Sequence, residues 1–271
     1  MRLTDQHIHS ACSVDSDAPM TEMALAARTR GMAAVCFTDH VEMDDARTGR
    51  LAPDWEKQRP LMLAAWRELM AEPPKDIEIR LGTELGCPHH MPELAAQIAA
   101  APELDFVLGS LHNLRDVTDF YYYKYTSEEE CARLNRLYLA ELTELAALDC
   151  FDVMAHIGYT CRYMAWAGFR EKIDTAHYGD ELRTLLKRLI EKGKGVEVNT
   201  SGLRQGNGPY PGPDILTLYR ELGGEIVTMG SDGHRPADAG AGISEAAELL
   251  RALGFRYYTE FERRQPVFRP L

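Results

Sequence analysis

The chain has 271 residues, of which 45% are hydrophobic, so it is long enough for one large α/β domain or two smaller ones. Its formal net charge is −12 and it lacks a basic stripe, so we expect no nucleic-acid partner. No run approaches the roughly 18 uncharged apolar residues of a membrane span, and no signal-peptide pattern is found, so we expect a soluble, cytoplasmic protein without a membrane partner.

Short apolar or β-branched runs alternate with longer segments of helical spacing. Strands are expected at 3–9, 33–39, 77–84, 105–112, 151–156, 194–201 and 225–232. Helices are expected at 21–30, 54–71, 92–100, 127–148, 175–192, 214–222 and 244–253, with an aromatic loop at 116–125 and a possible short eighth strand at 256–259. No repeat or Gly/Ser linker divides the chain, so residues 1–271 are treated as one domain.

Seven strands alternating with helices indicate parallel β/α units, and at this length a closed or nearly closed barrel is the natural arrangement. A doubly wound open sheet is the alternative. The first strand is not followed by G-x-G-x-x-G, so the dinucleotide-binding version of that alternative lacks support. The cysteines are scattered without a C-x-x-C pair, which favours reduced, structural thiols.

Polar side chains stand at the end of every predicted strand. In a parallel barrel these ends meet at one rim, where such enzymes keep their active sites. A single histidine in such a place is more often structural, but here six of the nine histidines converge. The strand-end residues are His7, His9, His40, Glu84, His112, His156, Asn199, Asp232 and His234.

The residue types at these strand ends indicate a metal centre. Imidazole and carboxylate without clustered thiolate suit Zn, Mn or Fe, and the set is larger than one four-coordinate ion needs. Two adjacent ions can hold the attacking and leaving oxygens of an in-line displacement, as in phosphatases. Glu84 is the candidate for a carboxylate that bridges two ions.

The order of these motifs resembles the polymerase and histidinol phosphatase (PHP) superfamily. The resemblance covers residues 3–234 and rests on HIH followed by Asp15, TDH at His40, GTE at Glu84, GSLH at His112, MAH at His156, and SDGH. GSLHN, VEVNTSGLR and VTMGSDGH are most similar to the histidinol-phosphatase branch. The resemblance implies a distorted (β/α)7 TIM-like barrel in a single domain, with two to three divalent ions at the rim.

The resemblance also implies a ligand set for each ion. The first ion would be held by His7, His9, Glu84 and Asp232, the second by Glu84, His112 and His156, and the third by Asp15, His40 and His234. Many relatives have histidine where this chain has Asp15, which is a harder, anionic ligand.

The expected reaction, from the branch resemblance, is hydrolysis of L-histidinol phosphate to L-histidinol and phosphate in histidine biosynthesis. Metal-bound hydroxide would attack phosphorus, with Glu84, Asp232 and His234 as catalytic residues. The third ion, a metal-bound water or a protonated His234 would neutralise the leaving alkoxide. The expected phosphate-binding residues are Arg162, Arg204 and Asn199, with Arg115 a weaker candidate.

The cationic end of such a substrate would prefer acidic or aromatic surroundings. The segments that could provide them are Glu42, Asp44 and Asp45 in VEMDD and the aromatic run at 120–125. We interpret His89 and His90 as loop residues and His177 as a helix-face residue, and place none of them in the metal set.

Three other functions fit parts of the pattern. One is a PHP phosphoesterase acting on another small phosphate ester, such as a nucleotide or sugar phosphate. A metal-dependent amidohydrolase also has H-x-H on its first strand, but the later strand ends here have no lysine. The third is a non-catalytic metal-binding regulatory module, which missing ligands would mark, whereas all nine positions carry competent ligands. The sequence does not determine the oligomeric state.

Overall fold

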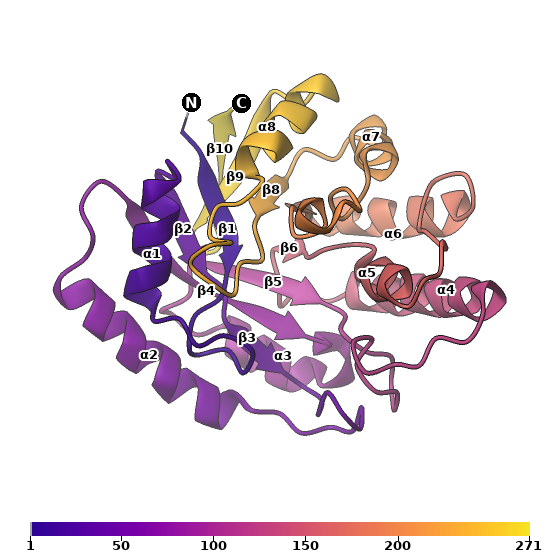
Figure 1. Cartoon of the computed structure of the whole chain (residues 1–271), viewed down its shortest axis with the longest axis horizontal. Coiled ribbons are helices and arrows are strands. Elements are labelled where there is room, and N and C mark those ends of the chain that lie inside the picture. The colour runs from indigo at the N-terminus through magenta and orange to yellow at the C-terminus, as the bar shows by residue number, and fades with distance from the viewer. Residues whose placement is uncertain (1) are drawn as a thin grey trace.

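The predicted strands form a parallel sheet that curls into a nearly closed barrel (Figure 1). A computed structural model describes residues 2–271. The strands are β1 (Thr4–Ile8), β2 (Ala34–Phe37), β3 (His40–Glu42), β4 (Glu78–Gly86), β5 (Phe106–Ser110), β6 (Val153–Met154), β7 (Gly195–Asn199) and β8 (Val227–Gly230). Their order is β1-β2-β4-β5-β6-β7-β8, and the unpredicted short strand β3 pairs with β4.

The two ends of this sheet approach each other through backbone hydrogen bonds. The N–H of His9 donates to the Gly233 oxygen at 2.9 Å, and the N–H of Asp232 donates to the His7 oxygen at 2.8 Å. The residues after β8 are therefore bonded to β1. The predicted seven-stranded α/β barrel in a single domain is confirmed.

Helices surround the sheet in Figure 1 and bury their apolar faces against it. They are α1 (Met20–Thr29), α2 (Trp55–Ala71), α3 (Pro92–Ala99), α4 (Glu128–Leu145), α5 (Tyr159–Trp166), α6 (Gly179–Glu191), α7 (Pro213–Glu221) and α8 (Ile243–Ala252), with short 3-10 helices η1 (Pro88–His90) and η2 (Leu203–Gln205). The Ser127 hydroxyl accepts from the Glu130 N–H and caps α4, while α6 buries leucines at helical spacing.

Two helix predictions need correction. Helix α5 was not predicted, because it is only eight residues long and directly follows Gly158, whose φ of 107° suits glycine. Helix α6 begins at Gly179 rather than at 175, since the Asp174 carboxylate accepts the N–H groups of Ala176 and His177 and fixes a turn there. His177 is therefore an exposed turn residue and does not lie on a helix face.

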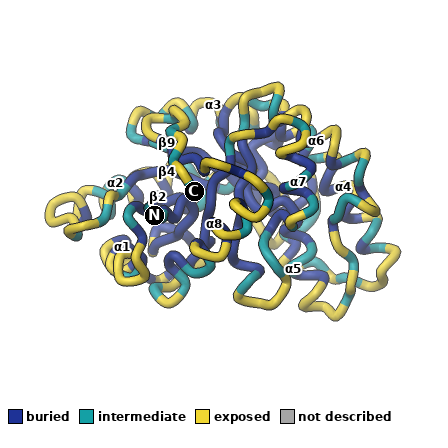
Figure 2. Tube along the Cα trace, turned by 90° about the horizontal axis from the view of Figure 1, so that it is seen from above, coloured by how far each residue is buried: buried dark blue, intermediate teal, exposed yellow. Residues whose placement is uncertain are grey.

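Alternation along the strands divides the core into an outer and an inner part. On β5, Val107 packs in the main cluster with the helices, whereas Phe106 and Leu108 belong to a separate, smaller cluster inside the barrel. On β7, Val196 and Val198 face outward, so the buried Glu197 and Asn199 point inward. Figure 2 shows the buried strands enclosed by partly exposed helices.

The inner apolar cluster is completed by a C-terminal hairpin. Strands β9 (Tyr257–Glu262) and β10 (Gln265–Pro270) pair antiparallel with each other outside the barrel path. The Phe261 ring of β9 stacks on the Phe106 ring, with 4.9 Å between the ring centroids. This contact covers the N-terminal mouth of the barrel. The possible short eighth strand at 256–259 does form, as part of β9, but it is not a barrel strand, because the residues after β8 are already bonded to β1.

The hairpin also brings the two ends of the chain together, as Figure 1 shows. The Tyr258 hydroxyl donates to the Arg2 carbonyl oxygen at 2.9 Å, and Arg2 forms an ion pair with Glu260.

Among residues 2–271, the helices are all too short or too polar to span a membrane.

Candidate metal centre

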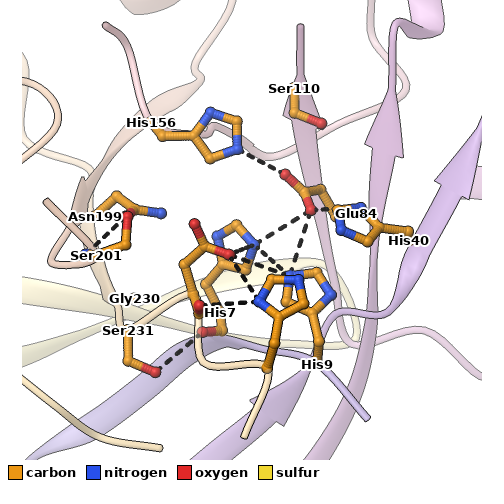
Figure 3. A network of polar contacts seen from close by, with 12 residues as sticks. His7, His9, His40, Glu84, Ser110, His156, Asn199, Ser201, Gly230 and Ser231 are labelled. Atoms are coloured by element: carbon orange, nitrogen blue, oxygen red, sulfur yellow. Dashed lines mark hydrogen bonds and ion pairs between the residues drawn. The ribbon is translucent and has the colours of Figure 1, made fainter. Parts of the chain in front are cut away.

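The nine side chains expected to bind metal gather at the C-terminal rim of the barrel. Figure 3 shows the buried Glu84 of β4 in the middle, with His156 on one side and His7, His9 and His40 on the other. His7, His9 and Glu84 are 0% exposed, and Asp232 is 6% exposed. The strand ends thus place several ionisable groups in a site largely closed to solvent.

A first group of donor atoms surrounds Glu84 Oε2. His7 Nε2 lies 3.3 Å and His9 Nε2 3.6 Å from this oxygen, and the two ring nitrogens are 3.0 Å apart. Asp232 Oδ1 lies 3.8 Å from His7 Nε2 and 3.5 Å from His9 Nε2. Four donors from β1, β4 and the end of β8 therefore face one another.

A second group surrounds the other oxygen of the same carboxylate. His156 Nε2 lies 2.8 Å and His112 Nε2 3.3 Å from Glu84 Oε1. The His40 ring also approaches Glu84, with Nδ1 3.0 Å from Oε2. Glu84 therefore faces donors on both sides, as a bridging carboxylate would.

A third group lies nearer to solvent. Asp15 Oδ2 is 3.0 Å from His234 Nε2 and 3.6 Å from His40 Nε2, and the Asp15 side chain is 52% exposed. Nitrogen atoms of His9, His40 and His234 also lie within 4.8 Å of one another. Asp15 is thus the most exposed of the nine side chains.

The donors fit metal ions. For bond lengths near 2.0–2.1 Å, the ligand atoms of tetrahedral zinc are about 3.3 Å apart, close to the separations around Glu84 Oε2. Within residues 2–271, buried Glu84 Oε2 and His234 Nε2 have ion-pair neighbours at 3.0 Å but no hydrogen bond of good geometry. Buried polar atoms that are only partly satisfied in this way favour an additional bound group.

The electrostatics of the rim also favour cations. Burial opposes charge on Glu84, yet His7, His40 and His112 outweigh it and hold the pKa of this carboxyl well below its usual value. Burial likewise opposes protonation of His7, but Glu197 and Glu84 raise its pKa well above the usual value. Burial and the neighbouring rings of His234 and His40 instead lower the pKa of His9.

Two further carboxylates orient the candidate ligands, and the sequence reasoning gave neither this role. Glu197 Oε1 lies 2.7 Å from His7 Nδ1, and its other oxygen accepts the His156 N–H at 2.9 Å. Glu42 Oε1 lies 2.9 Å from His112 Nδ1. A carboxylate on the second ring nitrogen of a histidine is typical of metal sites. The signal available in the sequence was an acid two residues before Asn199 inside an apolar strand.

The backbone makes room for these contacts. A Cβ on Gly230 would lie 2.2 Å from Glu197 Oε1 and 2.3 Å from the His7 Cβ, so only glycine fits there. Asp232 has a φ of 53°, in the left-handed region that few non-glycine residues adopt and that recurs at functional sites.

The expected phosphate-binding residues already have partners in the protein. Arg162 on α5 donates to Asp232 Oδ2 at 2.9 Å and lies over the Tyr159 ring at 5.1 Å. Arg204 donates to the carbonyl oxygens of Ser231 and Asp232 at 2.6 and 3.2 Å. Arg162 is thus at the rim beside a candidate ligand, whereas Arg204 fixes the backbone that carries it.

The amide of Asn199 lies within an internal network. Its nitrogen donates to Glu197 Oε2 at 3.1 Å, and its oxygen accepts from the backbone and hydroxyl of Ser201. Arg115 donates to the His89 carbonyl oxygen at 2.7 Å. Phosphate binding by Asn199, Arg115 and Arg204 stays a prediction, and these contacts compete with it.

The acidic and aromatic segments divide between core and surface. Glu42 and Asp44 are engaged with histidines, and exposed Asp45 bonds to Thr48. Phe120 is buried, whereas Tyr121 is 59% exposed and meets the Tyr163 ring of α5 at 5.8 Å. His89 and His90 form the 3-10 helix η1 and are buried, so their interpretation as loop residues is wrong. They lie outside the rim groups.

Comparisons with known proteins identify relatives of this chain. A family model described as the PHP domain matches residues 5–201. The histidinol-phosphatase of Lactococcus lactis subsp. lactis is 27% identical over 96% of this chain and 95% of its own length, and the probable histidinol-phosphatase of Thermotoga maritima is 26% identical over 94% of each. A crystal structure of the L. lactis histidinol phosphate phosphatase, complexed with zinc, L-histidinol and phosphate, is 24% identical, covers 98% of this chain and 99% of its own, and has a TM-score of 0.79.

Proposed function

Since the chain belongs to the PHP domain family, we propose that it is a metal-dependent phosphomonoesterase that hydrolyses L-histidinol phosphate to L-histidinol and phosphate. The observation that carries the proposal is the Glu84 carboxylate, whose two oxygens face two separate groups of histidines. Residues 1–271 form one PHP-type phosphoesterase domain in this proposal, because relatives named histidinol-phosphatase match over almost their whole length. A cytoplasmic location stays a prediction.

The proposed ligands fall into the three groups described above. His7, His9, Glu84 and Asp232 would hold one divalent ion, and Glu84, His112 and His156 would hold a second. Asp15, His40 and His234 would hold a third. Zinc, manganese and iron all accept such nitrogen and oxygen donors. Zinc has the support of the L. lactis phosphatase complex, since that protein binds it.

The ions would activate a water for attack on phosphorus and neutralise charge on the phosphate oxygens. Arg162 is the proposed phosphate-orienting residue, because stacking on Tyr159 and the bond to Asp232 hold its guanidinium at the rim. Its Nε has no hydrogen-bond partner among residues 2–271, which leaves a donor for phosphate.

The leaving alkoxide needs a proton or a neutralising charge. His234 Nε2 lies 3.0 Å from Asp15 Oδ2, so the ring can hold a proton there and pass it to the departing oxygen. The same nitrogen is the proposed donor of the third group. His234 therefore serves as a ligand or as a proton donor, but not as both at once.

A substrate panel tests this function. We expect the zinc- or manganese-loaded protein to hydrolyse L-histidinol phosphate with a kcat/KM at least about 100-fold above those for nucleoside monophosphates and sugar phosphates, a difference of about 2.7 kcal/mol. Equal, slow rates on all esters would favour a different small phosphate ester. Binding of metal without turnover of any ester would favour the regulatory module.

A further inference from the structure

A second cluster of metal-binding side chains lies outside the rim centre. His89 and His90 come from η1, and Glu141 comes from α4. His89 Nε2 lies 3.0 Å and His90 Nε2 lies 3.2 Å from Glu141 Oε2. The three donor atoms all lie within 4.8 Å of one another, and the cluster shares no side chain with the rim groups.

The surroundings of this cluster orient two of its three donors, His90 and Glu141. Asp44 Oδ2 lies 2.5 Å from His90 Nδ1, and the Asn113 amide holds that carboxylate at 3.1 Å. The other oxygen of Glu141 accepts the Arg115 N–H at 3.2 Å, which leaves Oε2 for the cluster. A carboxylate behind a histidine is the arrangement that orients Nε2 toward a metal and raises its basicity.

The separations between the donor atoms are those expected for ligands of a single metal ion. The separations of 3.0 and 3.2 Å are near the roughly 3.3 Å between ligand atoms of tetrahedral zinc. His89 is 6% exposed, and its Nδ1 is buried without a hydrogen-bond partner among residues 2–271.

Cys87 and Asp44 offer a rival donor set around His90. The Cys87 thiol, however, donates to the backbone oxygen of Asn113 at 3.5 Å and to its side-chain oxygen at 3.4 Å. Burial also raises the pKa of this thiol well above its usual value, so the thiolate that binds metal is disfavoured. The His89, His90 and Glu141 set is therefore the better site.

We propose that His89, His90 and Glu141 bind one zinc ion at a site separate from the rim. Two imidazoles and a carboxylate suit zinc, and the Glu141 side chain is 17% exposed, so solvent can supply the fourth ligand. The ion holds η1 against α4. Helix η1 directly follows β4, the strand that carries Glu84.

Anomalous diffraction at the zinc edge tests the site on the wild-type protein. Crystals are grown with free zinc buffered at a low level, so that only specific sites fill. We expect a peak between the Nε2 atoms of η1 and Glu141 Oε2, in addition to any peaks at the rim. Density for zinc at the rim with none at this cluster would overturn the proposal and leave the function intact.

Native mass spectrometry of zinc-loaded variants gives a second, independent test. Glu141→Gln keeps the shape of the side chain but removes its charge, and we expect one zinc ion fewer per chain. Glu144→Gln, on the exposed side of the same helix, is the matched control and should bind as many ions as the wild type. Equal counts in the two variants would contradict the site. If Glu141→Gln does not fold, His89→Gln replaces it in this test and should also bind one zinc ion fewer. Circular dichroism checks that each variant is folded.

Discussion

Both ends of the barrel bury charged side chains, but they neutralise the charge in different ways. At the N-terminal mouth, Arg80 donates to Glu260 and Glu262, each at 2.9 Å, and Arg264 pairs with Asp152. At the C-terminal rim, Glu84 faces imidazoles, which release a proton when they bind a metal ion. At the mouth, arginines of the chain neutralise the buried carboxylates. At the rim, the proposed metal ions would neutralise them, and metal ions can exchange with solvent.

This difference separates the buried charges that stabilise the fold from those that would take part in metal binding and catalysis. Arginine keeps its proton at any accessible pH, so the ion pairs of the mouth act as fixed braces for the hairpin. Histidine can release its proton to make way for a metal. Changes at the mouth should therefore alter stability, and changes at the rim should alter metal binding and turnover.

The largest effect is expected for Glu84→Gln, which removes the carboxylate shared by two donor groups. We expect a loss of at least about 1,000-fold in kcat/KM, or about 4 kcal/mol, in a metal-replete assay. Circular dichroism and the unfolding temperature should show a folded protein. The exposed Glu129→Gln is the control, and full turnover by Glu84→Gln would refute the proposed centre.

Arg80→Met should act on the opposite end and on a different property. Among residues 2–271 it leaves Glu260, which is 0% exposed, with Arg2 and Arg269 as charged partners, and should lower the free energy of unfolding by about 3 kcal/mol. Urea denaturation measures this loss. The double variant Arg80→Met, Glu260→Leu should recover part of it, since the buried carboxylate that has lost a partner is then removed as well. A fully folded single variant that loses turnover would argue against the division between the two ends.

Glu197→Gln should weaken metal binding while leaving every proposed ligand in place. The change removes the charge behind the His7 ring, so we expect metal affinity to fall by about 10–100-fold. Titration against a chelator of known affinity measures it, with exposed Glu191→Gln as the control. Unchanged affinity would show that Glu197 only packs in the barrel.

Metal binding at the rim should strengthen as pH rises. Burial disfavours the charged ring of His112, but Glu42 and Glu84 outweigh it and raise its pKa to about 10. Below that pH the ring of the metal-free protein carries a proton that an ion must displace, so affinity should rise about tenfold per pH unit for each proton released. Calorimetry in two buffers of different ionisation enthalpy counts these protons, and a count of zero would contradict the expectation.

The smallest effect is expected for Asp15, the most exposed of the proposed ligands. Asp15→Asn should reduce turnover by only about threefold to tenfold, since interactions of a half-exposed charge are partly screened. Asp15→His places a neutral donor there and should keep turnover nearer to that of the wild type. Steady-state kinetics compares the two, and loss of activity as large as that of Glu84→Gln would show that the third group is as essential as the first.

The sequence predicted the barrel and its rim because both follow from local patterns. Alternating strands and helices require parallel pairing, and parallel strands carry His7, Glu84, His156 and Asp232 to the same end. It did not reveal that Glu197 supports His7, because the two residues are 190 positions apart and meet only inside the closed barrel. The partners of Arg204 and the covering of the mouth by Phe261 were hidden for the same reason.

The donor types at the strand ends could be read from the sequence, which has imidazoles and carboxylates there rather than thiolates. The contacts between these donors depend on the folded chain, which places Glu84 between two groups and brings His89 and His90 to Glu141. The difference arises because sequence patterns act over short distances along the chain. Backbone periodicity sets the direction of a side chain within its own element, whereas the separation of two donors depends on how the whole sheet curls and how the helices pack around it.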